Sequence, residues 1–96
     1  MKLTNEFTKK IAEILKAIGH PIRVEILRLL FDKKDKRVSV KQIHESLGLT
    51  QSETSRHLIV LKNVSILNCG KVGSNSFYYI NDADPFIQCI SVCLKK

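Results

Sequence analysis

Polar side chains recur along residues 50–63 at spacings that place them together on one side of a helix. Thr54, Leu58 and Leu61 follow one another at intervals of four and three, so they define the opposite, inward side. The residues expected to point outward or to flank the first turn are Gln51, Ser52, Ser55, Arg56, Ile59 and Asn63. Amide, hydroxyl and guanidinium groups at the start of a helix can hydrogen-bond base edges in a DNA major groove, while the positive helix N-terminus approaches a phosphate. An ordinary solvated helix surface is the alternative interpretation.

The segment before this helix has the local signals of a second helix and a tight turn. Thr50 and Glu53 fit the capping box, in which each side chain bonds the other residue's backbone amide, and Ser39 and Gln42 fit it as well. Gly48, a residue suited to a helix end, separates the two helices. A short helix over residues 40–47, a turn and a longer helix together predict a helix-turn-helix.

The segment after the helix changes to a β pattern. Residues 66–69 and 77–80 predict two strands, the second of them aromatic, and the turn-forming residues 70–75 lie between them. A hairpin in this place is the wing of a winged helix-turn-helix. Lys71 is its only charged residue, and we count it among the candidate DNA contacts.

Three further amphipathic helices flank these elements. Apolar residues from Leu3 to Ile18 predict a first helix that ends at Gly19, and Pro21 restarts a second. Asp84 is expected to cap a last helix with Pro85 at its first position. The predicted fold is thus mainly α with a small β-hairpin, in the order α-α-α-α-β-β-α.

The apolar stripes of the first and last helices exceed what a chain of 96 residues readily covers. The sequence therefore predicts a dimer that pairs these two helices. The residues expected at the dimer interface are Phe7, Ile11, Ile14, Ile90 and Cys93.

Length and composition are those of one domain, residues 1–96, with 44% hydrophobic residues and a formal net charge of +7. This charge favours an anionic partner, nucleic acid first and a membrane surface second. No apolar run is long enough for a membrane span, and the first residues lack a signal-peptide pattern, so we expect a cytoplasmic protein that does not act at a membrane. We interpret the charge run Asp32–Arg37 as a solvated loop first and a phosphate-contacting patch second.

Three parts of the chain resemble the ArsR/SmtB family of small bacterial winged-helix repressors. The resemblance lies in Leu15–Arg23 with Ile26–Leu27, in Gln51–Leu58 with Leu61–Lys62, and in Tyr78–Ile80. It covers nearly the whole chain, and the segment Ser55–Leu58 is its most specific part. It implies a homodimer that binds an imperfect DNA palindrome and represses nearby genes. Gln51, Ser52, Ser55 and Arg56 would then read the DNA, while His57 is expected to be packed and hydrogen-bonded near the core, with a DNA contact as the alternative.

The chain departs from the family pattern at several positions. His20 stands directly before the proline, where the family usually has Asp, and this predicts a poorer N-cap. Ser65 stands where the family usually has Gly, directly after the helix expected to read DNA over residues 50–63, the reading helix. One family metal site needs Cys-x-Cys where this chain has Ser39-Val40-Lys41. The other needs ligands at both ends of the last helix. Here Asp82 and Asp84 are present near its start, but its far end is Lys95-Lys96, which supplies no such ligand. We therefore expect no metal site and no cofactor.

Cys89 and Cys93, at i and i+4, share one face of the last helix, and free Cys at such positions usually packs as a small apolar residue. We expect both to lie in the dimer interface, and no disulfide framework. The favoured function is a sequence-specific double-stranded DNA-binding regulator, a homodimeric repressor. The alternatives are a winged-helix protein-interaction module and a thiol-based sensor that uses Cys89 and Cys93. An enzyme is not expected, because no nucleophile–base pair, carboxylate pair or phosphate-binding Gly loop is found.

Overall fold

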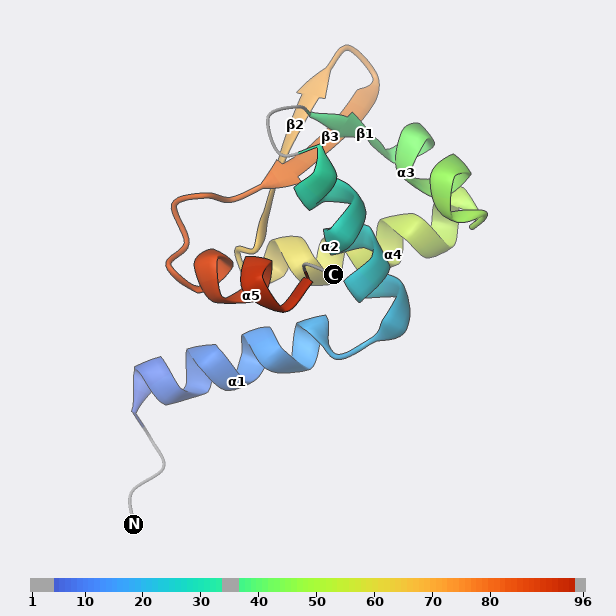
Figure 1. Cartoon of the computed structure of the whole chain (residues 1–96). Coiled ribbons are helices and arrows are strands. Elements are labelled where there is room, and N and C mark those ends of the chain that lie inside the picture. The colour runs from blue at the N-terminus through green and yellow to red at the C-terminus, as the bar shows by residue number, and fades with distance from the viewer. Residues whose placement is uncertain (1–4, 34–36, 95–96) are drawn as a thin grey trace.

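Five helices surround the base of a small sheet in the computed structural model, which describes residues 5–33 and 37–94 (Figure 1). The elements are α1 (Glu6–Ile18), α2 (Pro21–Asp32), β1 (Val38–Ser39), α3 (Val40–Leu47), α4 (Gln51–Asn63), β2 (Leu67–Val72), β3 (Asn75–Ile80) and α5 (Phe86–Leu94). The mainly α winged helix-turn-helix is confirmed. Leu3, expected in the first helix, and residues 34–36 of the charge run lie outside the described residues.

The sheet differs from the predicted hairpin in two ways. It has a third strand, because β1 pairs antiparallel with β3, with Val38 opposite Tyr78. The wing strands are also longer than expected, since residues 70–72, predicted as loop, pair with residues 75–77. Gly73, with φ of 62°, makes the turn between them. Gly70 has poor intrinsic strand preference, but its pairing with Phe77 across the ladder overrides that preference.

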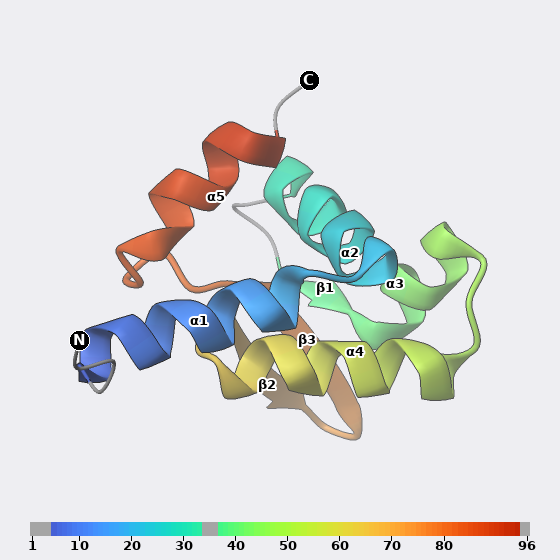
Figure 2. The ribbon, with the colours of Figure 1, turned by 90° about the horizontal axis from the view of Figure 1, so that it is seen from below.

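One hydrophobic core lies between the helices and the inner face of the sheet. Its buried members are Ile14, Ile26, Leu27, Leu30, Val38, Ile43, Leu58, Leu61, Ile66, Leu67, Tyr78, Ile80, Ile87 and Ile90. Figure 2 shows α1 lying between α4 and α5. The helices α1 and α5 therefore close the core on the side away from the wing.

Side-chain caps define the helix starts. Asn5 accepts a hydrogen bond from the amide of Phe7 at the start of α1. His20, for which we expected weaker capping than an Asp would give, also caps its helix, because its Nδ1 accepts from the amide of Ile22 at 3.1 Å. The helix α5 begins at Phe86, one residue later than expected, with Asp84 accepting from the Phe86 amide at 2.9 Å.

Ser65 follows α4 with φ of 66°, in the left-handed region that favours glycine. This conformation costs a non-glycine residue about 1–2 kcal/mol. A glycine avoids that cost but loses about 0.5–1 kcal/mol more chain entropy on folding. Ser65→Gly should therefore stabilise the fold by about 0.5–1 kcal/mol. Chemical denaturation measures the difference. Gly48, with φ of 67° and open space around its Cβ position, offers the reverse control. Gly48→Ser should destabilise the fold, and a destabilised Ser65→Gly protein would contradict the strain argument.

Candidate nucleic-acid interface

The turn between α3 and α4 is built by local hydrogen bonds. Both capping boxes form: Gln42 N donates to Ser39 Oγ at 3.1 Å, and Glu53 N donates to Thr50 Oγ1 at 3.1 Å. Gly48 adopts the left-handed conformation at the end of α3. The hydrogen bonds from the backbone amide and hydroxyl of Thr50 lower the pKa of the Glu53 carboxyl. These contacts fix the direction in which α4 leaves the turn.

The two sides of α4 are divided as its sequence predicts. Thr54, Leu58 and Leu61 are fully buried against the core. The residues exposed on the other side are Ser52, Arg56, Ile59 and Asn63. We call the surface formed by Gln51, Ser52, Ser55, Arg56 and Ile59 the reading surface. It combines an amide, two hydroxyls, one guanidinium and one aliphatic side chain at the N-terminal part of a helix.

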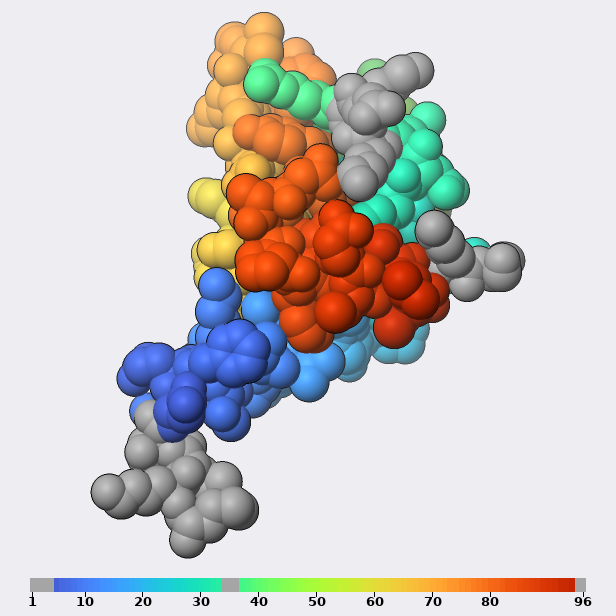
Figure 3. All heavy atoms as spheres, turned by 60° about the vertical axis from the view of Figure 1, so that its left-hand side comes forward, coloured from blue at the N-terminus to red at the C-terminus, as the bar shows by residue number. Residues whose placement is uncertain are grey.

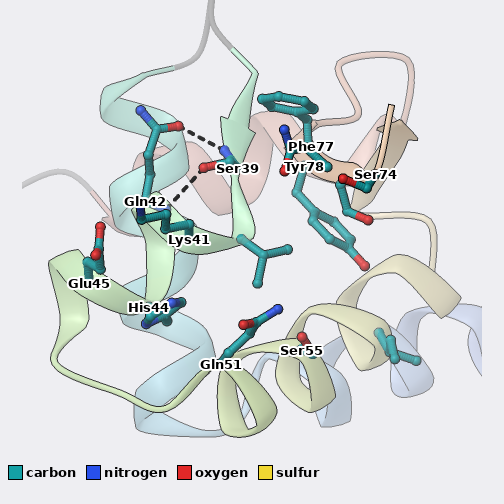
Figure 4. A pocket seen from close by; sticks show the side chains of 14 residues that line it. Ser39, Lys41, Gln42, His44, Glu45, Gln51, Ser55, Ser74, Phe77 and Tyr78 are labelled. Carbon is teal, nitrogen blue, oxygen red and sulfur yellow. Dashed lines mark hydrogen bonds between the residues drawn. The ribbon is translucent and has the colours of Figure 1, made fainter. Parts of the chain in front are cut away.

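A cleft of about 820 Å³ runs beside the reading surface, between α3, α4 and the wing. Gln51, Ser55 and Ile59 line it from α4, and residues 74–78 line it from the wing. Figure 4 shows Gln51 and Ser55 on the floor of this cleft and Phe77 and Tyr78 on the facing wing. The structure thus gathers polar groups from three elements around one hollow.

The two wing strands, β2 and β3, carry a single charged residue, Lys71. Lys71 is exposed on β2, opposite Ser76. A second cation reaches the sheet from outside the hairpin, because the guanidinium carbon of Arg37 lies 5.3 Å from the ring centre of Tyr79. Arg37 belongs to the charge run that we interpreted mainly as a solvated loop, so its place on the wing was missed. The run of basic residues was the signal available for it.

His57 connects α4 to the rest of the protein. Arg23 of α2 donates from Nε to His57 Nδ1 at 3.1 Å and from Nη1 to the carbonyl of Ala17 at 3.0 Å. The ring of His20 lies 4.7 Å from that of His57, centre to centre. The expectation of a packed, hydrogen-bonded His57 is confirmed. This cluster ties the reading helix to both α1 and α2.

Burial lowers the pKa of His57, and the charges of His20, Arg23 and Arg56 lower it further against the opposing effect of Glu53. Below about pH 6.5, the ordinary value, the unfolded chain therefore takes up a proton at His57 more readily than the folded chain. Folding stability present at neutral pH should fall as the pH drops through the folded pKa of His57. Urea unfolding between pH 7.5 and 5 measures this loss. His57→Gln, which cannot titrate, should lose less stability over the same interval, and an equal loss in both proteins would contradict the role of His57.

The outer surfaces of α1 and α5 lie side by side on one face of the molecule (Figure 3). Phe7 is 71% and Val92 70% exposed, and Cys93 is exposed as well. Ile11 is half-buried and, with Phe7, lines an apolar groove of about 320 Å³ between the two helices.

Two of the residues predicted for the dimer interface do not offer a surface. Ile14 is 1% and Ile90 5% exposed, because both pack into the chain's own core. Helical periodicity identifies the apolar side of a helix. It does not distinguish residues buried in the chain's own core from residues left for a dimer partner. The candidates that remain accessible are the exposed Phe7 and Cys93 and the half-buried Ile11, and Leu15 and Val92 are exposed on the same two helices.

Cys89 and Cys93 are both free and exposed in the single chain, whereas Cys69 is half-buried. Within residues 5–33 and 37–94, no three His, Cys, Asp or Glu side chains come together as a metal site. Lys95-Lys96, the far end of one family metal site, is outside the described residues. Of the helices in the described part of the chain, none has the length and apolar character needed to cross a membrane.

The fold and the geometry of α3 and α4 define a winged helix-turn-helix protein. The family model described as "Bacterial regulatory protein, arsR family" matches residues 20–68, just over half of the chain. The chain belongs to this family of DNA-binding transcriptional regulators, and the resemblance read from its residues is confirmed.

Curated relatives and solved structures agree with this assignment. The chain is 40% identical to MJ1325, an uncharacterized helix-turn-helix transcriptional regulator of Methanocaldococcus jannaschii, over 77% of this chain and 81% of the relative. It is 37% identical to the transcriptional repressor PagR of Bacillus anthracis, over 74% of this chain and 69% of PagR. The structure of HlyU from Vibrio cholerae superposes with a TM-score of 0.80 at 27% identity, covering 94% of each chain.

Proposed function

We propose that residues 1–96 form one winged-helix domain that binds a specific palindromic site in double-stranded DNA as a homodimer and represses transcription from it, in the cytoplasm. The observation that carries this proposal is the reading surface, where Ser52 and Arg56 are exposed while the opposite side of α4 is fully buried. The net charge of +7 supplies a general attraction for phosphate.

The reading surface has the chemistry for recognising bases. An arginine can donate two hydrogen bonds to the major-groove edge of a guanine, and an amide such as that of Gln51 suits an adenine. Ser52 and Ser55 can bond either bases or phosphates. Lys71 and Arg37, which lies against the Tyr79 ring, would contact the DNA backbone from the wing.

The exposed apolar residues of α1 and α5 support a homodimer. Phe7 and Val92 would remain in water in a monomer, whereas a two-fold pairing of this face covers both in each protomer. Two reading helices related by such a symmetry axis recognise two half-sites about one DNA turn, 34–36 Å, apart. PagR is named a repressor and HlyU an activator, and we propose repression for this chain.

Selection of bound fragments from random DNA, followed by sequencing, tests the proposal. A palindromic motif with half-sites one turn apart is the expected result, and a reporter placed behind this motif should be silenced by the protein. Binding without any sequence preference would overturn specific recognition. Failure to bind DNA at all would favour a winged helix that contacts another protein.

A thiol-based sensor is the second candidate, and the exposure of Cys89 and Cys93 on one face of α5 favours it. We nevertheless predict that arsenite, zinc and mild oxidants leave DNA binding unchanged, because we expect a dimer partner to cover both thiols. Fluorescence anisotropy of the selected duplex, with and without each agent, measures this. The variant with Cys89→Ser and Cys93→Ser should behave as the parent does. DNA release that occurs in the parent and is absent in this variant would establish the sensor instead.

A further inference from the structure

Ile59 is the one aliphatic side chain of the reading surface, and it is 49% exposed. At about 100° per residue it lies some 20° around α4 from Ser52, near the middle of the exposed side. It also lines the same cleft as Gln51 and Ser55. The other side chains of this surface are polar, so Ile59 marks an apolar point among hydrogen-bonding groups.

Only one group on the major-groove edge of DNA is apolar, the C5 methyl of thymine. When a partly exposed isoleucine covers such a methyl group, apolar surface is removed from water, and this favours binding. Contact with a phosphate or a base amine gives the isoleucine no comparable stabilisation. We propose that Ile59 packs against the C5 methyl of a thymine in each half-site and so selects that base. This proposal rests on the proposed function and adds to it the chemistry of one recognised position.

The spacing along α4 places this thymine relative to the base read by Arg56. Three residues separate Arg56 from Ile59, which is about 4.5 Å along a helix axis. Base pairs are stacked about 3.4 Å apart, so the thymine lies one or two base pairs from the base that Arg56 contacts. The selected motif should therefore contain a conserved thymine close to the position that Arg56→Ala relaxes.

Replacement of thymine by deoxyuridine removes the methyl group and leaves every hydrogen-bonding group in place. Each thymine of the selected duplex is replaced in turn, symmetrically in both half-sites, and binding is measured by fluorescence anisotropy for the parent and for Ile59→Ala. At one thymine the parent should lose about fourfold in affinity for each half-site, the value of one buried methyl group. The same replacement should leave Ile59→Ala unaffected, and the remaining thymines serve as internal controls.

The outcomes separate this proposal from the function on which it rests. If DNA is bound specifically but no deoxyuridine position weakens the parent, or the loss is equally large in Ile59→Ala, the methyl contact is overturned and the proposed function stands. A selected motif without thymine overturns it in the same way. If no motif is selected, the proposed function fails first. Since Ile59 is exposed and Ala favours helix, the variant should fold as the parent does, which circular dichroism checks.

Discussion

Replacing Arg56 with alanine should weaken binding to the selected DNA site by about 1–3 kcal/mol for each half-site and relax the base preference at one position of each. Arg56 is an exposed member of the reading surface, and its guanidinium can donate two hydrogen bonds to one base. Fluorescence anisotropy at one fixed salt concentration, repeated with all four bases at each half-site position, measures both effects.

A lost positive charge also weakens DNA binding without any base contact, so the control must remove the same charge elsewhere. Lys16→Ala does this on the exposed side of α1, far along the chain from the reading helix. It should lower affinity for all sequences slightly and equally. If Arg56→Ala and Lys16→Ala bind every duplex alike, Arg56 supplies general charge only and the assignment of the reading surface is wrong.

Phe7→Glu should convert the dimer to a monomer and lower affinity for the palindrome on the order of 10²–10⁴-fold, because two linked half-site contacts become one. The exposed Phe7 ring would be covered by the partner, and a carboxylate in that apolar place loses its hydration without gaining a partner. Its place in the first turn of α1 favours an acidic residue, so the monomer should keep its helices. Sedimentation velocity gives the oligomeric state, and anisotropy gives the affinity.

Ala12→Glu is the matched control, since it adds the same charge to the same helix about 140° around from Phe7. It should leave both the dimer and the affinity close to those of the parent. A charge at Ile90 would be a poor test, because this side chain is buried in the core, where a charge should destabilise the whole fold. A Phe7→Glu protein that sediments as a dimer would show that α1 lies outside the dimer interface.

The sequence by itself determined the parts of the site that depend on neighbours within about one helical turn. The capping boxes at Ser39 and Thr50 fix where α3 and α4 begin, and Gly48 fixes where α3 ends. The intervals of four and three residues settle which side of α4 is buried, as the full burial of Thr54 and Leu58 confirms. Hydrogen bonds and side-chain periodicity of this kind act locally, so they can be read from the order of residues.

Only the tertiary structure decided the features that depend on residues distant in the chain. A strand as short as β1 exists because β3 pairs with it, and residues 70–72 are strand because residues 75–77 lie opposite. Arg23 meets His57 across 34 positions of the sequence. The wrong prediction that Ile14 lies in the dimer interface has the same cause. Helical periodicity shows that an apolar face must be covered, but it does not show which element covers it. In this structure the chain's own core covers Ile14, and that depends on how the helices pack.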